Sequence, residues 1–176
     1  MRRLHPSLTA LYWSVFAASL LVASLFVSWQ ALAGFDFAYP VWHEALGIDD
    51  TIARYGPDNR WRRGFEHTTA VERARLFAAI VDAIHADGRG LADLRYHDPE
   101  GRELGRLLRE PEIVHLQDVA RLVRWFETAG IAALALVLAA TAEARWRHRA
   151  PPPARRFLAG TAALVGVAGI AVLAIG

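Results

Sequence analysis

Long runs without a charged residue stand out along this chain. One extends from Ser7 to Phe35 and another from Phe157 to Gly176. Each is long enough for a helix that crosses the roughly 30 Å hydrocarbon core of a bilayer, which takes about 20 residues. A shorter uncharged run, Thr128 to Ala142, can also span if Trp125 and Phe126 lie at the membrane interface. The pattern therefore predicts three transmembrane helices.

The arginines predict the orientation of these helices. Arg2 and Arg3 precede the first run, and residues 145–156, between the second and third, hold five arginines. Short loops rich in arginine stay in the cytoplasm, so we expect the N-terminus inside and the central segment outside. The expected parts are a cytoplasmic tip with transmembrane helix 1 (1–35), an extracytoplasmic helical domain (36–124), transmembrane helix 2 (125–144), a cytoplasmic Arg/Pro loop (145–156) and transmembrane helix 3 (157–176).

A cleaved signal peptide is the alternative for the first run. The chain opens with Met-Arg-Arg, and Ala31-Leu32-Ala33 resembles a cleavage site. The apolar run is longer than the roughly 7 to 15 residues of a signal sequence, however, which favours a retained helix.

The central segment reads as mainly helical, so the expected fold class is an all-α integral membrane protein. Thr69 to Glu72 is a capping-box pattern, and apolar residues at helical spacing then predict a helix over Thr69–His85. Leu91–Asp98 suits a short strand or an extended edge, and Asp98–Gly101 suits a turn. Pro111 fits the first turn of a helix that runs on into the second span.

The charge balance argues against nucleic-acid binding despite a pI of about 9.5. Residues 36–127 hold thirteen Arg and seventeen Asp or Glu, a net charge of −4, whereas the two cytoplasmic pieces hold seven Arg and one Glu, a net of +6. The basic excess thus follows membrane topology. Cysteine and lysine are both absent, which excludes disulfides, thiolate metal sites and Schiff-base chemistry.

A polar loop, residues 56–69, combines Asn59, Arg60, Trp61 and Arg63. It can be an ordinary surface loop. It can also contact phospholipid head groups or a lipid-modified substrate, because arginine binds phosphate through a planar fork and tryptophan favours the interface. We count Asn59, Arg60, Trp61, Arg89 and Arg95 as candidate lipid or substrate contacts, and Arg60, Arg89 or Arg95 as candidate oxyanion donors.

Glu112, His115, Asp118 and Arg121 recur every third residue and form one stripe of a helix. A histidine held by a carboxylate can act as a general base, with Asp118 or Glu112 as the orienting group. The same spacing is also typical of an ordinary solvated helix face. It does not match the HExxH pattern of zinc enzymes, and no other cluster predicts a metal site.

The E-x-x-H-L-x-D-V motif at Glu112–Val119, with a long first span and a helix that continues into the membrane, resembles the small bacterial integral membrane proteins that include the lipoprotein intramolecular transacylases. The likeness covers residues 8–176 in layout. It implies that His115 is catalytic with Asp118 as its acidic neighbour. Ala120 and Arg121 stand where the family has a lysine directly after the motif.

Members of that family continue to a second histidine and a fourth span, whereas this sequence ends at Gly176. Either the sequence is a piece of a longer protein, or this member lacks the second histidine. The expected location is the bacterial cytoplasmic membrane, with several spans.

The resemblance implies an enzyme that shifts one acyl chain of a diacylglyceryl-modified lipoprotein onto its N-terminal amine. Such a reaction needs no cofactor, and the expected partners are membrane lipids and lipoprotein N-termini. The alternative is a non-catalytic interaction or chaperone-like protein that binds an exported partner. A sensor is disfavoured because no cytoplasmic output module follows the second span, and a transporter because the spans lack mid-membrane charges.

Overall fold

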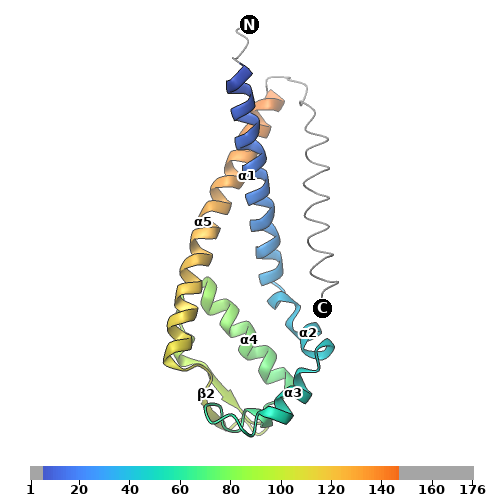
Figure 1. Cartoon of the computed structure of the whole chain (residues 1–176), viewed down its shortest axis with the longest axis vertical. Helices are drawn as coiled ribbons and strands as arrows, with labels where there is room; N and C mark the ends of the chain where they lie inside the picture. Colours follow the sequence, from blue (N-terminus) through green and yellow to red (C-terminus); the bar gives the residue numbers. More distant parts are fainter. Residues whose placement is uncertain (1–5, 147–176) are drawn as a thin grey trace. The chain divides into compact units, whose positions relative to one another are not determined.

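The computed structural model describes residues 6–146, which are mostly helical (Figure 1). The chain divides into two compact units, one of residues Met1–Gln30 with Phe126–Gly176 and one of residues Ala31–Trp125. We call the second the helical domain. Five α-helices and a two-stranded sheet make up the regular structure of the described residues: α1 (Pro6–Ala33), α2 (Tyr39–Ala45), α3 (Ile48–Tyr55), α4 (Ala70–His85), β1 (Arg95–His97), β2 (Glu103–Arg106) and α5 (Glu110–Trp146).

Two of these helices, α1 and α5, are long and apolar enough to cross a membrane by length and composition. They match the first two predicted spans, and the prediction that the helix starting near Pro111 continues without a break is confirmed. With 37 residues, α5 is much longer than a bilayer requires. Its first part, up to Arg124, is charged and belongs to the helical domain, and only Thr128–Ala142 is uncharged. The third predicted span, 157–176, lies outside the described residues.

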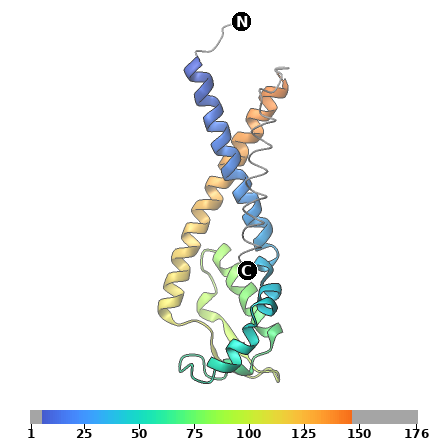
Figure 2. The same cartoon turned by 45° about the vertical axis from the view of Figure 1, so that its right-hand side comes forward.

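Helices α1 and α5 cross at close range within the first unit (Figure 2). Gly130 of α5 lies against Phe26 of α1, where a Cβ atom would overlap the phenyl ring. The ring of Phe126 meets those of Phe26 and Trp29 edge to face, with centroids 6.4 and 6.2 Å apart. A small residue that lets two backbones approach is the usual device of helix packing in membranes.

Helix α4 forms as its sequence predicts. The Thr69 side chain accepts a hydrogen bond from the backbone N–H of Glu72 at 3.1 Å, which satisfies one of the free donors at the helix start. Leu76, Val81 and Ala83 supply its buried apolar side.

The two short strands form an antiparallel hairpin, with Tyr96 opposite Gly105. The predicted turn at Asp98–Gly101 is confirmed: the Gly101 N–H donates to the Asp98 carbonyl at 2.9 Å, and Gly101 has a φ of +81°. Tyr96 is buried, and its ring lies against Gly105, which offers no side chain in the way.

The core of the helical domain lies between α4, the hairpin and the first turns of α5. One cluster joins Leu76, Tyr96 and Leu107, and a second joins Ala83, Leu91 and Ile113. Because Ile113 belongs to the second cluster, the start of α5 is fixed against the rest of the domain. Short 3₁₀ segments connect the elements at Asp36–Ala38, Phe65–His67 and Leu91–Asp93.

Candidate functional site

His115 lies on an exposed face of α5. The helix puts His115, Asp118, Leu122 and Trp125 on one stripe because they follow at steps of three and four residues. Leu122 and Trp125 are 69% and 73% exposed, which is unusual for such large apolar side chains. The stripe runs about 15 Å along the helix, at 1.5 Å per residue. It therefore joins a histidine to an apolar surface that leads toward the uncharged part of α5.

Glu112, the first residue of the motif, has a structural role. Its carboxylate accepts hydrogen bonds from Arg62 Nη2 at 2.8 Å and from the backbone N–H and the guanidinium of Arg109 at 2.9 and 2.8 Å. These hydrogen bonds from Arg109, and then Arg62, lower the pKa of Glu112 to about 2. Glu112 thus holds the 56–69 loop to the start of α5, and within the described residues it forms no hydrogen bond or ion pair with His115.

Asp118 pairs with Arg121 one turn further along α5, and both side chains are exposed. Within residues 6–146 His115 has neither a hydrogen bond nor an ion pair, so the structure joins it to neither motif carboxylate. His115 is the motif's one charged or titratable side chain without a structural partner in the described chain.

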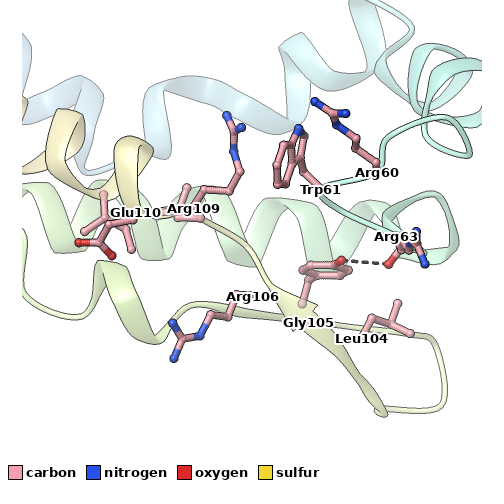
Figure 3. A pocket seen from close by; sticks show the side chains of 11 residues that line it. Arg60, Trp61, Arg63, Leu104, Gly105, Arg106, Arg109 and Glu110 are labelled. Atoms are coloured by element: carbon pink, nitrogen blue, oxygen red, sulfur yellow. Dashed lines mark hydrogen bonds between the residues drawn. The ribbon is translucent and has the colours of Figure 1, made fainter.

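A second candidate site lies on the other side of the helix start, where β2, the loop around Trp61 and the first turn of α5 enclose a pocket of about 420 Å³. Arg60 and Trp61, predicted as lipid or substrate contacts, both line it (Figure 3). Asn59 stands beside the pocket, and its side-chain oxygen accepts the Trp61 backbone N–H at 3.1 Å. The pocket's other charged lining residues are Arg63, Arg106, Arg109 and Glu110.

The other two predicted contact arginines lie elsewhere. Arg95 donates to the carbonyl of Ala92 at 3.0 Å and lies 3.4 Å from Glu103. Arg89 is exposed in the turn after α4, next to Gly88, which packs against Gln117. Gln117 is two residues from His115 and so faces the other side of α5. Neither arginine joins Arg60 and Trp61 at the pocket.

The structure also brings together a histidine and a carboxylate that the sequence analysis did not select. His97 Nδ1 lies 3.1 Å from Glu72 Oε1, which also accepts the His97 backbone N–H at 3.0 Å. Arg75 binds the same carboxylate with two hydrogen bonds of 2.7 Å. The hydrogen bonds from Arg75, and then His97, lower the pKa of Glu72 to about 2. Because Glu72 and His97 are 25 residues apart, no local pattern marks the pair.

Arg73 was also missed, and it is buried. Its guanidinium donates to His43 Nε2 at 3.1 Å and to the Thr68 carbonyl at 2.6 Å, and it pairs with Asp49. This network joins α2, α3 and α4. It accounts for the buried position of His43.

Within residues 6–146 no group of three or more His, Cys, Asp or Glu residues could hold a metal ion. The two candidate sites comprise one exposed histidine and a set of arginines around a tryptophan.

Comparisons with family models, with curated proteins and with solved structures find no match to this chain. The fold and the sites themselves thus define its class: a helical protein with two apolar helices fit to span a membrane and a helical domain of 95 residues, Ala31–Trp125, between them in sequence.

Proposed function

We propose that this chain is a membrane-bound enzyme that moves an acyl chain within diacylglyceryl-modified lipoproteins, with His115 as the general base. One observation carries the proposal: His115 is exposed and unpaired within the described residues, on the same face of α5 as the exposed apolar side chains of Leu122 and Trp125. The likeness of the Glu112–Val119 motif to the lipoprotein transacylases names the substrate class.

The reaction is an acyl shift from oxygen to nitrogen on one molecule. The neutral α-amine of the lipidated cysteine attacks the ester carbonyl, an N–C bond forms, and the C–O bond to the glyceryl group breaks. His115 takes the proton from the amine and returns it to the leaving glyceryl oxygen, so protons balance without a cofactor. Because the amine and the ester share one molecule, their effective molarity is high, on the order of 10⁵ M or more when well oriented.

The apolar stripe suits this substrate. An acyl chain that lies along Leu122 and Trp125 brings its ester end toward His115 while the rest of the chain stays near the membrane. The stripe supplies the roughly 15 Å between His115 and Trp125 that the lipid must cover.

The two motif carboxylates have different parts in this proposal. Glu112 is a positioning residue that fixes the start of α5 through Arg62 and Arg109. Asp118 is the orienting group for the imidazole. To contact the imidazole, the Asp118 carboxylate must give up its ion pair with Arg121. The loss is small, because an exposed ion pair between residues three positions apart contributes at most about 1 kcal/mol.

The proposed topology has the N-terminus in the cytoplasm and the helical domain outside, in the bacterial cytoplasmic membrane. The arginines before α1 and in residues 145–156 support this orientation. In this orientation His115 lies on the extracytoplasmic side, where the proposed lipoprotein substrate would be.

The same exposed face also favours a second candidate function, binding of an exported protein without catalysis. Val114, Leu122 and Trp125 offer a partner apolar area on α5. This function needs no histidine, so the two candidates differ in their response to the loss of His115.

The test is mass spectrometry of lipoprotein N-terminal peptides from a host that lacks N-acylation of lipoproteins. Four samples are compared: empty vector, the full chain, His115→Ala and His67→Ala. His67 is the matched control because its side chain is also exposed, at 70%, but lies outside the motif.

We expect peptides with one acyl chain on the amine and one on the glyceryl group in the wild-type and His67→Ala samples. Their amount should fall by about 100-fold or more with His115→Ala, since general base catalysis contributes that much. Diacylglyceryl peptides with a free amine in all four samples, with the protein present in the membrane, would reject acyl transfer and favour the binding function.

A further inference from the structure

We propose that the pocket beside Trp61 is a binding site for a phosphate group, formed by Arg60, Arg63, Arg106 and Arg109. It is separate from the acyl-transfer proposal, because His115 does not line this pocket. The ligand is a phosphate monoester or diester, either on a soluble molecule or on a lipid head group.

The charge distribution of the helical domain supports this site. Residues 31–125 contain thirteen arginines and sixteen Asp or Glu. Eight of the arginines form ion pairs with carboxylates of the domain. Among the described residues the other five, which have no such pair, are Arg54, Arg60, Arg63, Arg89 and Arg106. Three of these five line one pocket, in a domain whose acidic residues outnumber its arginines.

The hairpin adds a further unbalanced charge. Arg106 stands directly opposite Arg95 in the strand register. Like charges at opposite positions of an antiparallel pair are destabilising. Arg95 is offset by Glu103, 3.4 Å away, and by backbone carbonyls. Arg106 has no carboxylate partner within the described chain. An anion in the pocket would therefore neutralise the positive charge of its guanidinium.

Trp61 holds one guanidinium group on either side of its ring. The Arg60 and Arg109 side chains lie on either side of it (Figure 3), with guanidinium carbons 4.8 and 5.2 Å from the centroid of the Trp61 ring. Stacking on an aromatic ring holds the Arg60 head while its N–H donors stay available. The Arg109 head is held in addition by Glu112, which accepts from its Nε and Nη2. Trp61 itself is 56% exposed, so the apolar part of an amphipathic ligand can contact it.

The loop that carries these groups is held at three points. Arg62 donates to the Leu107 carbonyl at 2.8 Å and to Glu112 at 2.8 Å. The buried Tyr96 hydroxyl donates to the Arg63 carbonyl at 2.9 Å, and the Asn59 side chain accepts the Trp61 N–H. A backbone that is already fixed loses little entropy when a ligand binds.

Phosphate suits the arginines best. The planar fork of a guanidinium binds two phosphate oxygens at once, which a point charge or a neutral donor cannot do. The Glu110 carboxylate also lines the pocket, and it repels a ligand that carries a second anionic group next to it.

The position along α5 favours a ligand from the aqueous phase. Ile113, at the pocket wall, lies twelve residues before Trp125, or about 18 Å along the helix. Trp125 is the residue that we expect at the membrane interface.

The first experiment is calorimetric titration of the full chain in dodecyl maltoside, a detergent without phosphate, with inorganic phosphate as the probe. Three proteins are compared: wild type, Arg60→Gln/Arg63→Gln/Arg106→Gln, and the matched control Arg54→Gln/Arg89→Gln. The control removes the two unpaired arginines of the domain that lie outside the pocket. Far-UV circular dichroism and thermal unfolding show whether each variant is folded.

We expect saturable binding of one phosphate by the wild type and the control, and at least 10-fold weaker binding by the folded triple variant. The affinity of the wild type should fall as salt rises. Absence of saturable heat with the wild type, or equal weakening in the triple variant and the control, would reject the site.

A second arm separates the two sources of phosphate. The wild type is titrated in nanodiscs of phosphatidylcholine alone and of phosphatidylcholine with phosphatidylglycerol. The same phosphate affinity in both discs and in detergent assigns the pocket to a soluble ligand. Weaker apparent binding in the discs, with a further loss in phosphatidylglycerol, assigns it to a head group that competes. Because these readouts require no acyl transfer, they test the pocket independently of His115.

Discussion

Arg62 and Glu112, 50 residues apart in sequence, form an ion pair in which Nη2 and Oε2 are 2.8 Å apart. Each side chain keeps only a quarter of its surface exposed. Arg62 lies before α4 and the hairpin in sequence, and Glu112 lies after them, in the first turn of the long helix α5. This pair therefore links the two ends of the segment that forms the core. The motif glutamate thus stabilises the fold, in addition to any role near His115.

Glu112→Gln should make the protein less stable and less sensitive to acid. The pKa of Glu112 is lowered from 4.5 to about 2 in the folded protein. The contribution of Glu112 to the free energy of unfolding is therefore complete above pH 4.5 and is lost as the pH falls toward 2. We expect the variant to lose on the order of 1–2 kcal/mol of unfolding free energy at pH 7, after allowance for solvent screening.

Thermal unfolding of the full chain in detergent between pH 2 and 7 measures this effect. Glu110→Gln is the control, because Glu110 has no ion pair among the described residues. Wild type and control should lose stability steeply between pH 4.5 and 2, and Glu112→Gln less so. Identical pH profiles for the two variants would contradict the role of Glu112.

Much of the local structure could be predicted from the sequence. The Thr69 cap, the end of α4 at His85, the turn at Asp98–Gly101 and the uninterrupted α5 all depend on neighbouring residues. Local preferences act over a few residues, and the sequence pattern records them directly. The prediction left Leu91–Asp98 open between a short strand and an extended edge. In the structure Leu91–Asp93 is a 3₁₀ helix and only Arg95–His97 is a strand, because its partner strand β2 is set by the tertiary fold.

The candidate sites were less predictable because they depend on long-range contacts. The trio Glu112, His115 and Asp118 shares a helix face, but Glu112 and Asp118 turn to arginines instead. Arg60 and Trp61 were selected by composition, whereas Arg106 and Arg109 reach the same pocket from the hairpin and the start of α5. No pattern along the sequence indicates that these residues line the same pocket.

Arg73→Ala should be among the most destabilising single substitutions in the domain. Arg73 is only 7% exposed, and its removal leaves the Thr68 carbonyl and His43 Nε2 without their donor. Unsatisfied buried groups cost about 1–3 kcal/mol each, so we expect a loss of about 2–4 kcal/mol. Arg75→Ala is the control, since Arg75 lies on the same helix but is half exposed, so its loss should destabilise the domain less. Equal losses in thermal unfolding would show that the buried network adds nothing.

Glu72→Gln should loosen the hairpin without unfolding the domain. The Glu72 carboxylate binds the backbone N–H and the ring of His97 at the end of β1. The neutral glutamine amide accepts these hydrogen bonds less strongly than a carboxylate does, and its NH₂ group is a donor that cannot accept them. Hydrogen exchange of the full chain should be faster by about 3- to 10-fold in Arg95–His97 and Glu103–Arg106, and unchanged in α4. Uniformly faster exchange, or none, would exclude a local role for this contact.

His115→Ala should leave the stability of the protein unchanged within about 0.5 kcal/mol. The side chain is exposed and has no hydrogen bond within the described residues, and surface substitutions of this kind have small effects. Thermal unfolding of the variant and the wild type provides the comparison. A marked loss would mean that His115 supports the fold, and a loss of acyl transfer in that variant could then not be assigned to chemistry.

The contact of Gly130 with Phe26 predicts a size complementarity between α5 and α1. A Cβ atom at Gly130 would overlap the phenyl ring, so Gly130→Val must force the two helices apart. Overpacking of this kind costs about 1–3 kcal/mol. Ala129→Val is the control, because Ala129 is exposed at the preceding position of the same helix and the substitution produces the same isopropyl side chain.

Phe26→Ala in the Gly130→Val background provides the decisive comparison for that contact. If the ring is the obstacle, its removal makes room for the valine, and the double variant should unfold at a higher temperature than Gly130→Val alone. The sum of the single effects should therefore exceed the effect of the pair in a double-mutant cycle. If Gly130→Val unfolds like Ala129→Val, or if the two single effects simply add, the helices do not depend on this contact, and the apolar parts of α1 and α5 are held by their other side chains.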